Sequence, residues 1–270
     1  MRRLTSPRPH LLQAVVCLAF VSCLYAEGPG PDATLSRDVN SPLTASQVVG
    51  NLVRRNAERK GELARLQGQR TYHLTYRGFP GDREAQMRVQ CLYQSPSSKQ
   101  FLILDSSGPK VILDKVFKKL LEGEQEASQS ENEQRSALNP DNYDFALVGY
   151  EQGPDGPAYI LDVQPKSKNR FLYQGRIWVD GNDFAVKKIK AEPARNPSLW
   201  TRKNEIEHEY MKVGHFWLPA HNRSVSLIRL GGTATLTIEY SDYEIVSAHG
   251  QRASSEPSST ESGKKHGGEQ

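Results

Sequence analysis

The sequence predicts an α+β protein that is mainly β, built on one large curled antiparallel sheet. Many segments carry apolar side chains at every second position, which is the period of a half-buried strand. Turn signals rich in glycine, proline and aspartate separate these segments, and from residue 142 onward no helical pattern interrupts them. We expect about ten strands, and an open sheet of that size tends to curl.

The first 26 residues have the layout of a secretory signal peptide. Three arginines precede an uncharged, mostly apolar run of 16 residues that ends at Ala26. This run is shorter than the roughly 20 residues of a membrane-spanning helix, which makes an uncleaved anchor the weaker interpretation. Cys23 ends a degenerate lipobox and is a candidate for acylation; the alternative is a small apolar residue of the signal peptide. Residues 27–43 are expected to form a flexible leader.

Charge and cysteine content narrow the class of protein. The chain has 35 basic and 31 acidic residues, a formal net charge of +4, but the predicted signal peptide removes three arginines and brings the balance close to neutral. Nothing in this balance suggests a nucleic-acid-binding protein, which would need a concentrated basic face. Cys91 is the only cysteine after residue 26, so an intrachain disulfide is not expected and the core alone must hold the fold.

Two amphipathic helices are predicted. The first follows Thr44, a plausible N-cap, and extends over residues 45–66 with an outer face of arginine, lysine and glutamate. The second starts at Pro109 and carries a broad apolar stripe. Its lysines precede its glutamates, which is the unfavourable order for the helix dipole, so tertiary packing must hold this helix. The polar segment 128–140 is expected to loop or to continue the helix weakly.

The sequence contains only weak signals of a catalytic or metal-binding site. Phosphate-binding loops, nucleophile elbows and paired metal-ligand motifs are lacking. His208, His215 and His221 make a poor zinc set and are best interpreted as surface or rim histidines. Glu205, Glu207 and Glu209 share one face of a strand, which points to a solvated outer surface and makes a glycosidase pair the less favoured interpretation. We therefore expect a protein without cofactor, metal or catalytic residues.

The chain resembles the bacterial outer-membrane lipoprotein-sorting proteins of the LolA/LolB type, and most closely their divergent LolA-like branch. Three segments carry the resemblance: GRIWVDGNDFAVKKIKAEPARNPSLW from residue 175, HFWLPAHNRSVSL from residue 215 and TLTIEYSDYEI from residue 235. The order of elements is also similar, and the resemblance covers about residues 44–246. The tail at 247–270 is expected to be disordered.

The resemblance implies an unclosed half-barrel with a helical lid over an apolar cavity. In the family that cavity takes acyl chains of lipoproteins or other lipids, and a cavity arginine contacts the lid; Arg77 and Arg88 are the candidates here. The candidate cavity and rim residues are Tyr72, Leu74, Tyr76, Met87, Val89, Tyr93, Phe101, Ile103, Ile177, Trp178, Trp200, Phe216 and Trp217. The candidate lid residues are Ile112, Val116, Phe117 and Leu120.

These features lead to the expectation of a monomeric periplasmic binding or carrier protein for acyl chains, not an enzyme. It would act in lipoprotein sorting or envelope lipid transport, with an inner-membrane exporter or an outer-membrane acceptor as partner, and it could be membrane-anchored if Cys23 is acylated. The main alternative is an envelope-stress regulator of the RseB type that binds a membrane-protein partner. A secreted hydrolase is the less favoured third. Trp200 lies in a proline-bounded loop, expected either at the mouth of the barrel or packed on its own sheet.

Overall fold

The computed structural model describes residues 41–255, apart from positions 97, 129, 196–200 and 230. The predicted signal peptide with Cys23, nearly all of the leader, Trp200 and residues 256–270 lie outside the described residues. Within them, none of the helices is both long enough and apolar enough to cross a membrane.

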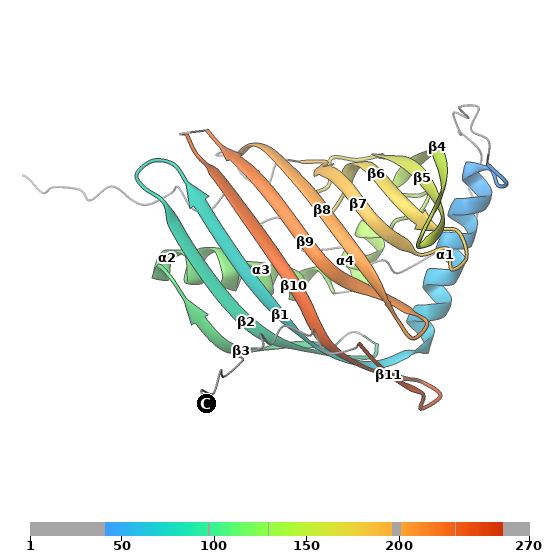
Figure 1. Ribbon diagram of the computed structural model, residues 1–270, viewed down its shortest axis with the longest axis horizontal. Helices are drawn as coiled ribbons and strands as arrows, with labels where there is room; N and C mark the ends of the chain where they lie inside the picture. Colours follow the sequence, from blue (N-terminus) through green and yellow to red (C-terminus); the bar gives the residue numbers. More distant parts are fainter. Residues whose placement is uncertain (1–40, 97, 129, 196–200, 230, 256–270) are drawn as a thin grey trace, which may run out of the picture.

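One antiparallel sheet of 11 strands forms the body of the protein (Figure 1). The strands run in the order β3-β2-β1-β10-β9-β8-β7-β6-β5-β4, and β11 pairs with β10 outside this path. Because β3 and β4 are opposite ends of the order, the sheet is not closed into a barrel. The strands are β1 (Leu63–Arg77), β2 (Arg83–Gln94), β3 (Ser98–Ser107), β4 (Tyr143–Gly153), β5 (Gly156–Pro165), β6 (Tyr173–Asp180), β7 (Val186–Pro193), β8 (Thr201–Val213), β9 (Phe216–Ile228), β10 (Thr233–Ser247) and β11 (Arg252–Ser254).

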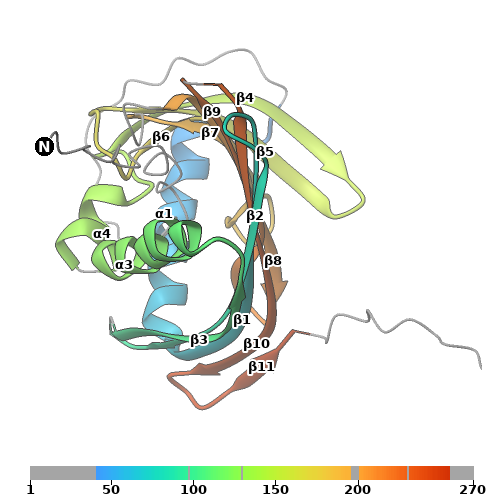
Figure 2. The same cartoon turned by 90° about the vertical axis from the view of Figure 1, so that its left-hand side faces the viewer.

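The helices lie on one face of the sheet, which curves around them (Figure 2). Helix α1 (Ala45–Glu62) begins with a capping box in which the Thr44 hydroxyl accepts from the Gln47 backbone N–H and the Gln47 side chain accepts from the Thr44 N–H. The second helical segment comprises α2 (Lys110–Ile112), the π-helical turn η2 (Leu113–Phe117), α3 (Lys118–Ala127) and α4 (Ser130–Ser136). We call this second segment, residues 110–136, the lid.

Two apolar clusters fill the concave side, one beneath each helical segment. The first packs the lid against β1, β2, β9 and β10 and includes Tyr72, Met87, Phe117, Leu120 and Ile238. The second packs α1 against β4 to β8 and includes Val48, Leu52, Leu161, Ile177 and Ile189. Cys91 is a free, buried thiol in this interior, as expected. Most of the concave side is thus a packed core.

The structure differs from the sequence-based expectation at three boundaries. The first helix ends at Glu62, and Leu63 and Leu66 belong to β1, because this segment pairs with β10 on one side and β2 on the other. The polar segment 128–140 contains helix α4. The segment expected as a disordered tail contributes β11, which pairs with β10 through residues 252–254.

Candidate functional site

A chamber lies between the two apolar clusters, where the C-terminal half of α1 and the lid face the middle of the sheet. Its volume is about 230 Å³. Part of its wall is apolar and is formed by Leu63, Leu66, Tyr93, Phe216 and Leu218. The rest carries polar and charged side chains, chiefly Arg70, Lys99, Glu124, His208, Asn222 and Tyr240. A larger hollow of about 650 Å³ is lined mostly by polar and charged groups, from the lid, the segment 167–171, Asn142 and Arg195, and by none of the cluster residues.

An ion-pair network joins the lid to the sheet at the chamber wall. Glu124 on α3 accepts a hydrogen bond from Nη1 of Arg70 on β1 at 2.6 Å, and its other carboxylate oxygen pairs with Nζ of Lys99 on β3. The Arg70, Lys99 and Glu124 side chains are only 12%, 20% and 4% exposed. Burial alone would raise the pKa of Glu124, but the two cations lower it to about 2. The carboxylate is therefore ionised at all physiological pH values.

Aromatic rings hold the Arg70 guanidinium in place. Its central carbon lies 5.1 Å from the centroid of the Tyr240 ring and 5.6 Å from that of Phe101, which are cation–π distances. Nη1 also donates to the Tyr72 hydroxyl at 3.4 Å. Burial raises the pKa of Tyr72 to about 12, so its hydroxyl stays protonated. Arg70 is thus a fixed cation on the concave face.

A polar strip crosses β8 and β9 beside this network. His208 is 1% exposed, Asn222 6% and Asn204 3%. Asn222 donates from Nδ2 to the Tyr240 hydroxyl at 2.7 Å, while its Oδ1 is buried with no hydrogen-bond partner in the described part of the chain. Ser224 donates to Oδ1 of Asn204 at 2.8 Å. The interior is therefore not uniformly apolar, and His208 is a buried chamber residue rather than a surface histidine.

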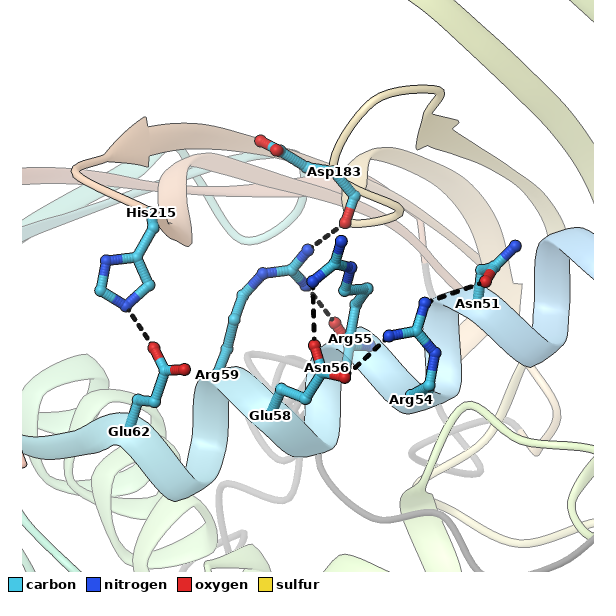
Figure 3. A network of polar contacts seen from close by, with 9 residues as sticks. All are labelled: Asn51, Arg54, Arg55, Asn56, Glu58, Arg59, Glu62, Asp183 and His215. Carbon is cyan, nitrogen blue, oxygen red and sulfur yellow. Dashed lines mark hydrogen bonds and ion pairs between the residues drawn. The ribbon is translucent and has the colours of Figure 1, made fainter.

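Polar contacts fix α1 to two turns of the sheet (Figure 3). Arg59 donates to the backbone carbonyl of Asp183 in the β6–β7 turn, and Glu62 pairs with Nε2 of His215 in the β8–β9 turn at 2.7 Å. Asp183 also accepts from the indole N–H of Trp217 at 2.9 Å. Helix α1 is therefore anchored at one end of the chamber. The exposed arginines and glutamate of its outer face pair with one another, as expected for a solvated surface.

Of the sequence-predicted cavity residues within the described part of the chain, three lie at the chamber wall: Tyr93, Phe216 and Trp217. Five are buried in the packed clusters instead: Tyr72, Leu74, Met87, Val89 and Ile177. Phe101 packs at the edge of the first cluster, Trp178 is half-buried next to the buried Ile177, and Tyr76 donates to backbone carbonyls at one end of the sheet. Ile103 is 48% exposed on the edge strand β3. The four lid residues, Ile112, Val116, Phe117 and Leu120, all pack into the first cluster.

Arg70 lines the chamber and contacts the lid through Glu124. The sequence-based candidates Arg77 and Arg88 are half-exposed and pair with Glu84 and Asp105 on neighbouring strands. The signal that could have identified Arg70 is its spacing, because it shares the period-2 face of Tyr72 and Leu74. Glu124 likewise follows Leu120 by four positions on the apolar stripe of the lid.

The three glutamates of β8 do not belong to this site. Glu207 and Glu209 pair with Nζ of Lys188 at 2.8 and 2.6 Å, and Glu205 pairs with Lys203 at 2.7 Å. They alternate along the strand with the buried Ile206 and His208, so they face away from the chamber. Among the described residues, no group of three or more acidic, histidine or cysteine side chains could hold a metal ion.

Comparison with known proteins gives matches at the level of solved structures. No known family model and no curated protein matches the sequence. A DUF1329 family protein from Desulfovibrio piger is similar at 12% identity and a TM-score of 0.37, over 74% of this chain and 92% of that one. A LolA superfamily protein from Nitrosomonas europaea is similar at 14% identity and a TM-score of 0.34, over 74% and 93%.

An outer-membrane lipoprotein-sorting protein domain from Vibrio parahaemolyticus is similar at 11% identity and a TM-score of 0.36, over 74% of this chain and 92% of that one. These identities and TM-scores are too low to carry the function of any of those proteins to this one.

Proposed function

We propose that this protein binds acyl chains of lipids or lipoproteins between its lid and the concave face of its sheet, and carries them in the bacterial cell envelope. The chamber is the observation that supports this. Its apolar wall is closed on one side by a helical segment that reaches the sheet through side chains, not through strand pairing. Such a segment can move without breaking the sheet.

The size of the chamber implies that the lid moves when a ligand enters. At about 230 Å³ it is smaller than the roughly 300–1,000 Å³ of ordinary ligand cavities. An acyl chain must therefore displace part of the first cluster, beginning with the side chains of the lid. Burial of the acyl chain gains about 0.8 kcal/mol per methylene, which offsets the loss of lid packing as the chain lengthens.

The layout of the N-terminal sequence supports a periplasmic location, with a membrane anchor if Cys23 is acylated. In that compartment the carrier would receive its cargo from an inner-membrane exporter and deliver it to an outer-membrane acceptor. The amphipathic wall suits this role better than a catalytic one, because the charged groups around the chamber are engaged in ion pairs with one another.

Native mass spectrometry of protein purified from its own host tests the proposal. We expect a population with the added mass of an acyl compound, released on denaturation. The variant Leu66→Trp should fill the chamber and lose most of this population, because Leu66 lies on its wall. Leu102→Trp is the matched control, since Leu102 is 60% exposed on β3.

Both variants should keep the wild-type circular dichroism spectrum. If wild-type protein carries no acyl compound and takes up none from added fatty acid, the proposal fails. It also fails if Leu66→Trp, folded as the wild type, carries as much ligand as the control.

A further inference from the structure

The chamber wall has more buried positive than negative charge. Arg70 and Lys99 share one carboxylate, that of Glu124, and all three side chains are largely withdrawn from solvent. The other ion pair at the chamber, Lys60 with Glu133 at 2.9 Å, is balanced and does not cancel the excess. A buried charge is costly unless an opposite charge accompanies it. The network formed by these side chains is therefore short of one negative charge.

Hydrogen-bond donors remain available on the same cations. A guanidinium has five N–H donors in a planar fork, yet only Nη1 of Arg70 makes hydrogen bonds with the residues that the structure describes. Its Nε and Nη2 form the edge that binds carboxylate and phosphate groups in a bidentate manner. The ammonium of Lys99 has three donors and a single ion-pair partner within the described chain.

Tyr240, whose ring lies beside the Arg70 guanidinium, adds a further donor. Asn222 donates to the Tyr240 hydroxyl oxygen, which leaves the hydroxyl hydrogen without an acceptor among the described residues. The Tyr240 hydroxyl is therefore a neutral donor at the chamber wall.

We infer that Arg70, Lys99 and Tyr240 form a subsite for the anionic head of the acyl ligand, a carboxylate or a phosphate monoester. This inference rests on the proposed function and specifies its ligand. The head would supply the missing negative charge and accept from the free donors, while the acyl chain extends along Leu66, Phe216 and Leu218. Neutral acyl compounds would bind through the chain alone.

A set of ligands with the same alkyl chain tests the inference by calorimetry on the delipidated protein: hexadecanoate, hexadecyl phosphate and hexadecanol, with inorganic phosphate as the free anion. We expect both anionic lipids to bind about tenfold or more tightly than hexadecanol. Inorganic phosphate should not bind measurably, because it lacks the chain. If it competes with hexadecyl phosphate at similar concentrations, the site is a free-anion site and the inference is overturned.

Substitution of Lys99 tests whether this residue is responsible for the preference for anionic lipids. Lys99→Met should reduce the affinity for hexadecanoate about tenfold and leave that for hexadecanol unchanged, and Lys99→Arg should restore the preference. Lys203→Met is the control, since Lys203 lies on the outer face and pairs with Glu192 and Glu205. Equal binding of hexadecanol and hexadecanoate to wild-type protein would overturn the inference and leave the proposed function standing. Failure of all three lipids to bind would contradict the proposed function itself.

Discussion

At the scale of single residues, the site depends on Glu124. It lies in the second half of the lid, where the helix dipole disfavours a negative charge. The sequence shows only an unfavourable order of lysines and glutamates, and the structure gives the reason: the carboxylate pairs with two cations on the sheet. Glu124 thus destabilises its own helix slightly, but it connects the lid to the sheet.

The ionisation of Glu124 should make stability depend on pH. Burial opposes its negative charge, but Arg70 and Lys99 bring its pKa from 4.5 down to about 2 in the native state. The ion pairs therefore stabilise the fold fully above about pH 4.5, and this contribution is lost as the pH falls toward 2. Over that interval we expect the free energy of unfolding to fall by about 3 kcal/mol more in wild-type protein than in Glu124→Gln.

Urea unfolding at a series of pH values measures this difference. At pH 7, Glu124→Gln should be less stable by about 3–5 kcal/mol, because it leaves two buried cations without a counter-charge. If the free energies of unfolding of wild type and variant changed in parallel from pH 5 to pH 2, Glu124 would not be the group whose ionisation stabilises the fold.

Spacing predicts part of this site from the sequence. The alternation along β1 places Arg70 inside with Tyr72 and Leu74, and the four-residue period of the lid places Glu124 beside Leu120. Arg70 and Glu124 meet only because of the position in which the lid packs on the sheet. Local sequence patterns do not predict that position. Alternation along β8 places His208 on the opposite face from the three glutamates, but its burial depends on the curvature of the sheet.

At the scale of elements, the proposed binding of an acyl chain requires the lid to move. Phe117 anchors it: the ring is fully buried, and its centroid lies 6.0 Å from that of Tyr72. It ends the π-helical turn η2, a local widening of the helix that is common at functional sites. Helix α1 packs on the second cluster and also makes polar contacts with two turns of the sheet.

Truncation of the Phe117 side chain should therefore destabilise the packing of the lid more than that of the sheet. Removing a buried phenylalanine side chain costs about 3–5 kcal/mol. In Phe117→Ala we expect faster amide hydrogen exchange over residues 110–127 and unchanged exchange in β8 and β9, measured by mass spectrometry. Val111→Ala, at a 40% exposed position of the same segment, should behave as the wild type. Equal acceleration throughout the sheet would show that the lid does not open on its own.

The sequence predicts the helical elements well and their ends less well. Both amphipathic stripes correspond to buried helix faces. The first helix is shorter than its apolar pattern indicates. Leu63 and Leu66 fit a helix pattern and a strand pattern equally well, and the long-range pairing with β10 makes this segment a strand. Helix α4 was missed as a distinct element because its sequence, SENEQRS, has no apolar period.

At the scale of the whole molecule, the curled sheet creates two cores with a chamber between them. The class of fold and the antiparallel run after residue 142 are predicted correctly from periodicity and turns. The pairing of β1 with β10, which joins the first three strands to the end of the chain, is not predictable from local pattern, because it links residues far apart in the sequence. That pairing brings Arg70 next to Tyr240 and completes the charged wall.

The central claim is that an acyl chain occupies the chamber beneath the lid. A crystal structure with an ω-brominated fatty acid tests it most directly, because anomalous scattering locates the far end of the chain. We predict a bromine peak on the concave side, in contact with Leu66, Phe216 or Leu218, with the lid displaced from the first cluster. A bromine found only on the outer surface, for example beside the exposed Leu102, with the lid still packed as described, would contradict the claim.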